Sequence, residues 1–160
     1  MKEEMNIKKN WLKSLTVAAV VAMASANASA EILTAMALNG QVSLGPTPIV
    51  FGGMTTPTFK HPGGTLAATF TAECFAQVEP QWGTAGVFAF MEVQDAAGSL
   101  VAKLYPNNGT LCSSGAPRAT FSTTGVANLP PGTFRVVVRG MVSNERASGY
   151  IGSRSIVVSH

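Results

Sequence analysis

An antiparallel β-sandwich of about eight strands, jelly-roll or immunoglobulin-like in topology, is the fold that the sequence predicts for residues 31–160. Short runs that alternate apolar and polar residues recur along this stretch. Glycine, proline and asparagine separate these runs, as is usual in all-β domains. No run shows sustained apolar spacing at the 3.6-residue period of an amphipathic helix. The stretch also holds a single pair of cysteines, Cys74 and Cys112, which predicts one disulfide in an exported domain.

Residues 1–30 are expected to be a secretory signal peptide, followed by a single secreted domain. Lysines precede the apolar run 15–26, and the small residues Ala-Ser-Ala at 28–30 form a cleavage signature. We therefore expect cleavage between Ala30 and Glu31. The apolar run is too short to span a bilayer, which takes about 20 residues. The mature chain is thus expected to lack a membrane span and to be periplasmic or extracellular.

The first predicted strands, 32–38, 41–44 and 48–51, are short. A hairpin is expected where Asn39-Gly40 joins the first two, because Asn-Gly suits a two-residue turn. The third is an apolar run that ends at a pair of glycines. Residues 55–64 contain two prolines and two glycines, and this composition predicts a loop.

The longest alternating segment, 63–78, predicts a central strand with one buried face. Leu66, Phe70 and Cys74 lie on its apolar face, while threonines and Glu73 lie on the other. Three roles remain open for Glu73: a carboxylate in solvent, a partner for an arginine on a neighbouring strand, or a general acid. An ion pair across strands is the commonest of these.

The run 87–94 predicts another long strand, and its fully apolar face is expected to point into the core. That face holds Val87, Ala89, Met91 and Val93. Phe88 and Phe90 lie on the opposite face. A turn at 95–98 then leads to the expected hairpin partner, 99–105.

Three further strands are expected at 119–128, 133–142 and 150–159, with a polar loop at 143–149. The side chains expected to point inward from the last two strands are Phe134, Val136, Val138, Val142, Ile156 and Val158.

The charge of the chain gives no indication of a nucleic-acid partner. The whole chain carries a formal net charge of +3, but residues 31–160 hold seven Lys and Arg against six Asp and Glu, a net +1. A nearly neutral domain lacks the basic surface that nucleic-acid binding requires. We expect no nucleic-acid partner.

The cysteine pair is best explained as a disulfide. Cys74 and Cys112 are 38 positions apart in the sequence, and closing such a loop contributes on the order of 4 kcal/mol to stability. A metal site would need more ligands than two distant cysteines. A reactive thiol pair would more often show Cys-x-x-Cys spacing.

Five segments occur in a characteristic order: Gly-Gly-Thr-Leu at 63–66, Phe-Thr-Ala-Glu-Cys at 70–74, Leu-Cys-Ser at 111–113, Leu-Pro-Pro-Gly-Thr-Phe-Arg-Val at 129–136 and Ser-Ile-Val-Val at 155–158. With them the chain resembles a loose group of small exported bacterial proteins that look like single β-sandwich domains with one cysteine pair. The resemblance covers residues 63–158 and implies a fold and export. No activity is established for the group, so the resemblance implies none. The chain departs from the group at 95–98, where the group has an aspartate-glycine turn, and at 152–154, where it has acidic residues.

No catalytic set, metal site or cofactor motif is expected. His61 lies in a loop rich in proline and glycine, His160 ends the sequence, and neither is spaced with other ligands as in a metal site. A nucleophilic serine would need a base and an orienting acid, and no Gly-x-Ser-x-Gly motif is present. A small hydrolase that uses His61 is therefore the less favoured alternative.

Aromatic residues give the one positive indication of a binding surface. Phe88 and Phe90 share a strand face, and Trp82 is close to them in sequence. Exposed aromatic side chains stack on sugars or dock proteins, whereas burial of both strand faces would leave no such surface. We expect a non-catalytic module whose partner is a glycan, a cell-wall polymer or a surface protein. A structural subunit that assembles through strand edges is the alternative.

Overall fold

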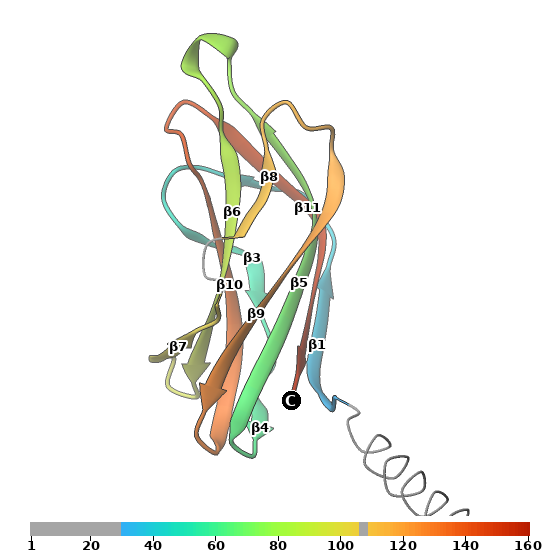
Figure 1. Ribbon diagram of the computed structural model, residues 1–160, viewed down its shortest axis with the longest axis vertical. Helices are drawn as coiled ribbons and strands as arrows, with labels where there is room; N and C mark the ends of the chain where they lie inside the picture. Colours follow the sequence, from blue (N-terminus) through green and yellow to red (C-terminus); the bar gives the residue numbers. More distant parts are fainter. Residues whose placement is uncertain (1–29, 106–108) are drawn as a thin grey trace, which may run out of the picture. The chain divides into compact units, whose positions relative to one another are not determined.

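Two antiparallel sheets face each other in the computed structural model, which describes residues 30–105 and 109–160 (Figure 1). A short 3-10 helix, η1 (Pro80–Trp82), follows β5, and the described residues contain no α-helix. The strands are β1 (Ile32–Leu38), β2 (Val42–Leu44), β3 (Ile49–Thr55), β4 (Phe59–His61), β5 (Gly64–Gln77), β6 (Gly86–Asp95), β7 (Leu100–Lys103), β8 (Gly109–Ser113), β9 (Ala119–Leu129), β10 (Gly132–Val142) and β11 (Ser148–Ser159).

The topology is that of a jelly roll. One sheet has the order β1-β11-β5-β9 and the other β3-β10-β6-β7. The short strands share edge positions of the two sheets: β2 lies in line with β1 beside β11, β4 with β3 beside β10, and β8 with β7 beside β6. The eleven strands of the described residues thus occupy eight positions, four in each sheet. Every link between positions crosses from one sheet to the other, except the β6–β7 hairpin. This connectivity decides between the two predicted sandwich topologies.

The predicted core faces are confirmed. On β5 the alternate residues Leu66, Phe70 and Cys74 are buried, as are all four residues predicted to point inward from β6. The six inward residues predicted on β10 and β11 are buried as well. Phe51 of β3 stacks on Phe70 across the two sheets, with ring centroids 5.4 Å apart. Alternation places one side of each strand in the core because successive side chains point to opposite faces.

The predicted disulfide is confirmed, and it links the two sheets. Cys74 lies on β5 in one sheet and Cys112 on β8 in the other, with Cα atoms 6.0 Å apart. Both cysteines are buried. The bond therefore runs through the core and fastens the two layers together.

The expected loop at 55–64 is wrong, because it contains β4 and the end of β3. Phe59 and His61 are buried while Lys60 between them is exposed, which is the alternation of a strand. β4 is only three residues long and lies between two prolines, so composition concealed it. The strand β8 around Cys112 was likewise not predicted.

Residues 1–29 lie outside the described residues, so the signal peptide and its cleavage between Ala30 and Glu31 stay predictions. Residues Glu31–His160 form one compact unit. Within the described part of the chain, no helix has the length and apolar character needed to cross a membrane.

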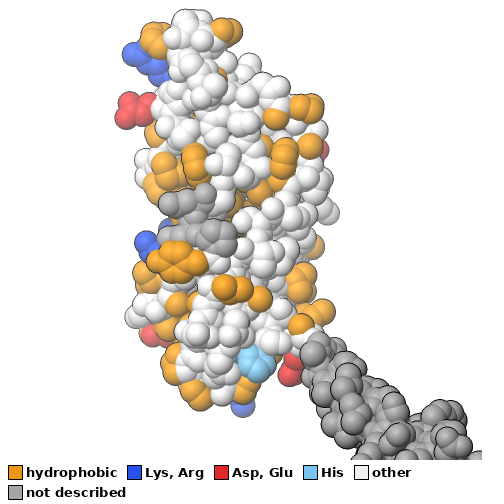
Figure 2. Space-filling view, viewed as in Figure 1, with side chains coloured by type: hydrophobic (Ala, Val, Ile, Leu, Met, Phe, Trp, Pro, Cys, Tyr) orange, Lys and Arg blue, Asp and Glu red, His pale blue; other side chains and the backbone are white. Residues whose placement is uncertain are grey.

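The unit has two ends, which β5 connects. β5 starts beside the turns at 61–64 and 130–131, which we term the His61 end, and it finishes near η1 and the loops at 114–118 and 143–147, termed the η1 end (Figure 1). At about 3.3 Å per residue its fourteen residues separate these ends by roughly 45 Å. Figure 2 displays a face with few charged groups, where a basic and an acidic group lie close together near the η1 end, at the top of the view.

Candidate binding site

Trp82 is presented at the tip of the loop that follows β5. The residue is 45% exposed. Pro80 begins the single helical turn, where a proline loses no hydrogen bond. Gly83 ends it with a φ of 80°, a conformation that glycine adopts without strain. The local sequence thus places a large aromatic side chain outside the core.

Asn144 connects this turn to the loop between β10 and β11. Its Nδ2 donates to the carbonyl oxygen of Trp82 (3.0 Å), and its Oδ1 accepts from the backbone N–H of Arg146 (2.9 Å). The carbonyl oxygen of Asn144 also accepts from the N–H of Ala147 (3.0 Å). One amide side chain therefore holds two loops together that are 62 residues apart.

Arg146 packs against the ring of Trp82. Its guanidinium carbon lies 3.5 Å from the ring centroid, within the range of a cation–π contact. The contact orders both side chains and keeps the cation at the surface. Arginine suits this position because a flat guanidinium group can stack on a ring while its N–H groups remain available.

These side chains border an open hollow of about 480 Å³, which we term the Trp82 hollow. Its lining residues are Trp82, Thr84, Ser143, Asn144, Glu145 and Arg146. Ser143 anchors the hollow to the sandwich, because its Oγ accepts from the N–H of Gly86 and its N–H donates to the carbonyl oxygen of Gly86, both at 2.9 Å. The hollow thus combines an aromatic ring, hydroxyl and amide groups, one positive and one negative side chain. The hydrogen bonds of Ser143 attach it to the sandwich.

The two phenylalanines predicted to share a surface with Trp82 lie elsewhere. Phe88 and Phe90 are half-buried on the outer face of β6, opposite Met141 and Arg139 of β10. Neither residue lines the Trp82 hollow. A binding surface that includes them stays a prediction.

Asn144 and Arg146 lie in the predicted polar loop at 143–149 and were not among the predicted site residues. The run Ser143-Asn144-Glu145-Arg146 is a dense polar cluster, but nothing local indicates that it meets Trp82. The jelly-roll connections bring the β5–β6 and β10–β11 loops to the same end of the sandwich. Only this connectivity assembles the site.

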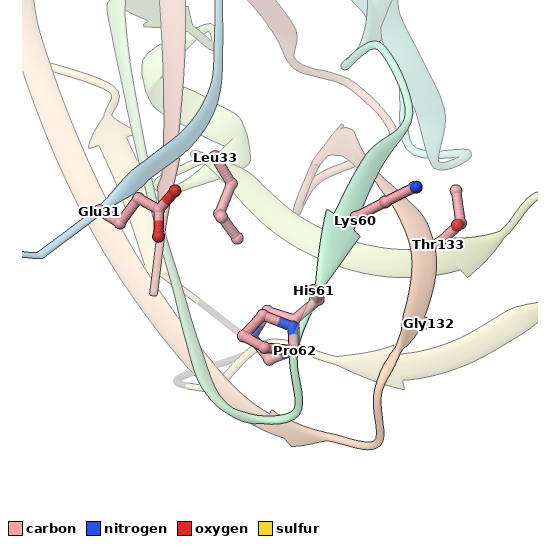
Figure 3. A pocket seen from close by; sticks show the side chains of 7 residues that line it. All are labelled: Glu31, Leu33, Lys60, His61, Pro62, Gly132 and Thr133. Carbon is pink, nitrogen blue, oxygen red and sulfur yellow. The ribbon is translucent and has the colours of Figure 1, made fainter.

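A second open hollow, of about 530 Å³, lies at the His61 end (Figure 3). It is lined by Glu31, Leu33, Lys60, His61, Pro62, Gly132 and Thr133. In Figure 3, His61 and Pro62 occupy its middle, with Glu31 on one side and Lys60 on the other. The hollow lies where the edges of the two sheets, β1 and β4, come together.

His61 itself is buried, at 3% exposure. Its Nδ1 accepts from the N–H of Gly63 (3.1 Å), and its ring lies 4.9 Å from that of His160. Burial and then the charge of His160 lower the pKa of His61, while the backbone of Thr65 and Pro130 acts in the opposite direction. In the described residues neither ring nitrogen is hydrogen-bonded to a serine or threonine hydroxyl. The geometry therefore gives the hydrolase alternative no support.

Glu73 forms the ion pair expected of it. Both of its carboxylate oxygens meet the guanidinium of Arg118, at 2.7 and 2.8 Å. Arg118 lies just before β9 rather than on the strand itself, and both side chains are partly exposed. Among the described residues, no group of three or more His, Cys, Asp or Glu could hold a metal ion.

No protein-family model and no curated protein sequence matches the chain. Solved structures do match it in fold. The VP2 protein of infectious bursal disease virus, in a subviral particle, is 11% identical with a TM-score of 0.53 over 82% of this chain and 33% of that one. A carbohydrate-binding module of a Cellvibrio mixtus lichenase, solved with cellotriose, is 8% identical with a TM-score of 0.42 over 81% of this chain and 98% of that one.

A third match is the K3 adhesin domain of Lys-gingipain from Porphyromonas gingivalis, which is 17% identical with a TM-score of 0.35 over 66% of this chain and 62% of that one. The chain spans about a third of the length of the viral protein. At 11% identity the likeness to the viral protein shows the sandwich fold alone.

Proposed function

We propose that this chain is an exported, non-catalytic binding module and that it binds a glycan at the Trp82 hollow. The observation that supports the proposal is the exposed Trp82, whose backbone carbonyl oxygen accepts from Asn144 and whose ring contacts Arg146, beside hydroxyl and amide groups. Aromatic rings present a large apolar surface with little conformational freedom to lose. Sugar rings offer apolar C–H faces for such a ring and hydroxyl groups for the polar rim.

Binding to polysaccharides tests this proposal. Purified protein is incubated with insoluble cellulose, chitin and peptidoglycan, and with an array of soluble glycans. Trp82→Ala is expected to weaken binding of the retained glycan by about thirtyfold, the loss of one aromatic hot spot of about 2 kcal/mol. Tyr105→Ala is the matched control, since Tyr105 is also an exposed aromatic residue but lies outside the hollow.

Phe88→Ala distinguishes the loop site from the predicted sheet-face surface. Loss of binding in Phe88→Ala but not in Trp82→Ala would move the site to the outer face of β6. Unchanged binding in both variants would refute both surfaces.

One observation favours the assembly alternative, namely the free edge of β1. This strand, Ile-Leu-Thr-Ala-Met-Ala-Leu, has no charge and no proline, and within the described residues it pairs only with β11. Edge strands without such protection are prone to pair with other chains. By contrast, the free side of β9 is joined by Tyr105 through two backbone hydrogen bonds to Val126.

A second copy could add its own β1 in antiparallel pairing and extend both sheets. Such pairing would cover the half-buried Leu33, Met36 and Leu38 at this edge. Size-exclusion chromatography with light scattering would then show a dimer, and Ala35→Lys at the middle of the strand would return it to a monomer by placing like charges opposite each other. A strict monomer at high concentration would refute this function.

A further inference from the structure

We infer that the Trp82 hollow binds an acidic glycan, whose sugar units carry carboxylate groups, and that Arg146 binds the carboxylate. The inference rests on the proposed function, because it names the class of ligand for the same site. The contacts of the Arg146 side chain support it, because they differ from those of the other arginines in the described residues.

Arg146 differs from the other four arginines of the described chain. Each of those donates to an acceptor within the protein: Arg118 to Glu73, Arg139 to Glu92, Arg135 to Gln94, and Arg154 to the carbonyl oxygens of Gly40 and Gly152. In the described residues the guanidinium of Arg146 contacts the Trp82 ring and forms neither a salt bridge nor a side-chain hydrogen bond. Its five N–H donors thus remain available to a ligand.

The stacking on Trp82 also fixes the direction of these donors. A guanidinium carbon 3.5 Å from the ring centroid requires the flat group to pack against the ring face. Its N–H groups then point outward in a plane close to parallel with the ring. A carboxylate that enters in this plane can accept two parallel hydrogen bonds, the arrangement in which arginine binds carboxylates best.

The backbone prepares this geometry before a ligand arrives. The N–H of Arg146 is bound by Asn144 Oδ1, and Asn144 is itself bound to the carbonyl oxygen of Trp82. Cation, ring and amide therefore form one connected unit. A preorganised group loses less conformational entropy on binding.

Glu145 provides a second, independent test of the inference. It is the acidic residue that lines the hollow, and it forms no salt bridge within the described residues. Its carboxylate repels a negatively charged ligand, whereas it accepts hydrogen bonds from the hydroxyl groups of a neutral one. Glu145→Gln should therefore strengthen the binding of an acidic glycan only.

The test compares polygalacturonate with its fully methyl-esterified form, which has the same sugar backbone without the charge. Binding is measured by isothermal titration calorimetry at low salt. We expect the acid to bind at least about tenfold more tightly than the ester, the effect of one charge-assisted bidentate contact. Arg146→Ala should abolish this preference. Arg146→Lys should retain part of it, because lysine keeps the positive charge but lacks the planar group that donates two parallel hydrogen bonds.

Arg118→Ala serves as the matched control, since Arg118 is an exposed arginine at the same end that Glu73 already engages. It should leave the preference unchanged, while Glu145→Gln should raise affinity for the acid about two- to threefold, as expected for removal of one exposed repulsive charge. Equal binding of acid and ester, or binding of neutral glycans alone, would overturn the inference and leave the proposed function standing. Failure of every glycan to bind would overturn both.

Discussion

Replacing Cys74 and Cys112 together by alanine is expected to lower the free energy of unfolding by about 4 kcal/mol. The disulfide closes a loop of 38 residues, and in the chain-entropy model opening such a loop returns about 13 cal/mol/K to the unfolded chain. Changing both cysteines removes the cross-link without leaving a buried free thiol. The loss is a large part of the 5–15 kcal/mol that is typical of a domain.

Urea unfolding followed by tryptophan fluorescence measures this loss. With a slope of about 2 kcal/mol per molar urea, the midpoint should fall by about 2 M. Wild-type protein unfolded in the presence of a reductant should match the double variant, because both lack the same cross-link. A midpoint shift below about 0.5 M would contradict the reasoning, since the cross-link would then place little constraint on the unfolded chain.

Two further predictions concern His61 and Gly140. Because the pKa of His61 is lowered in the folded state, the unfolded chain binds more protons between that pKa and about 6.5, so stability should fall as the pH drops below about 6.5 by up to 1.4 kcal/mol per pH unit and level off below the folded pKa. The free energy of unfolding, measured with urea at pH 7.5, 6.5 and 5.5, should change less with pH in His61→Asn than in the wild type. An equal change with pH in both proteins would exclude His61 as the cause. Gly140→Ala should cost about 1–3 kcal/mol, because its Cβ would overlap the buried ring of Phe51. Gly45→Ala, with nothing within 4 Å of the new Cβ, is the control in the same unfolding assay, and equal stabilities of the two variants would contradict the packing argument.

The long strands could be predicted because their cause is local. In β5 and β6 every second residue is apolar, and this period alone determines which side chains face the core. At β4 the period cannot be recognised, because three residues between prolines give too short a pattern. The period also does not distinguish a jelly roll from an immunoglobulin-like sandwich, because both use the same alternating strands.

The candidate site could be predicted only in part. Trp82 was predicted as part of a binding surface because exposed aromatic side chains bind sugars or proteins and because it lies near Phe88 and Phe90 in the sequence. Its partners Asn144 and Arg146 are more than 60 positions away. No local pattern connects these loops, and the grouping of Trp82 with Phe88 and Phe90 relied on nearness in sequence.

The sequence by itself determined the class of fold, the faces of the main strands and the cysteine pairing, because these depend on residue period and on the small number of ways to pair two cysteines. The tertiary structure decided which loops meet. It placed Arg146 on the ring of Trp82 and buried His61 between the sheet edges. These outcomes depend on the order in which strands cross between the two sheets, which is a property of the whole chain and of no single segment.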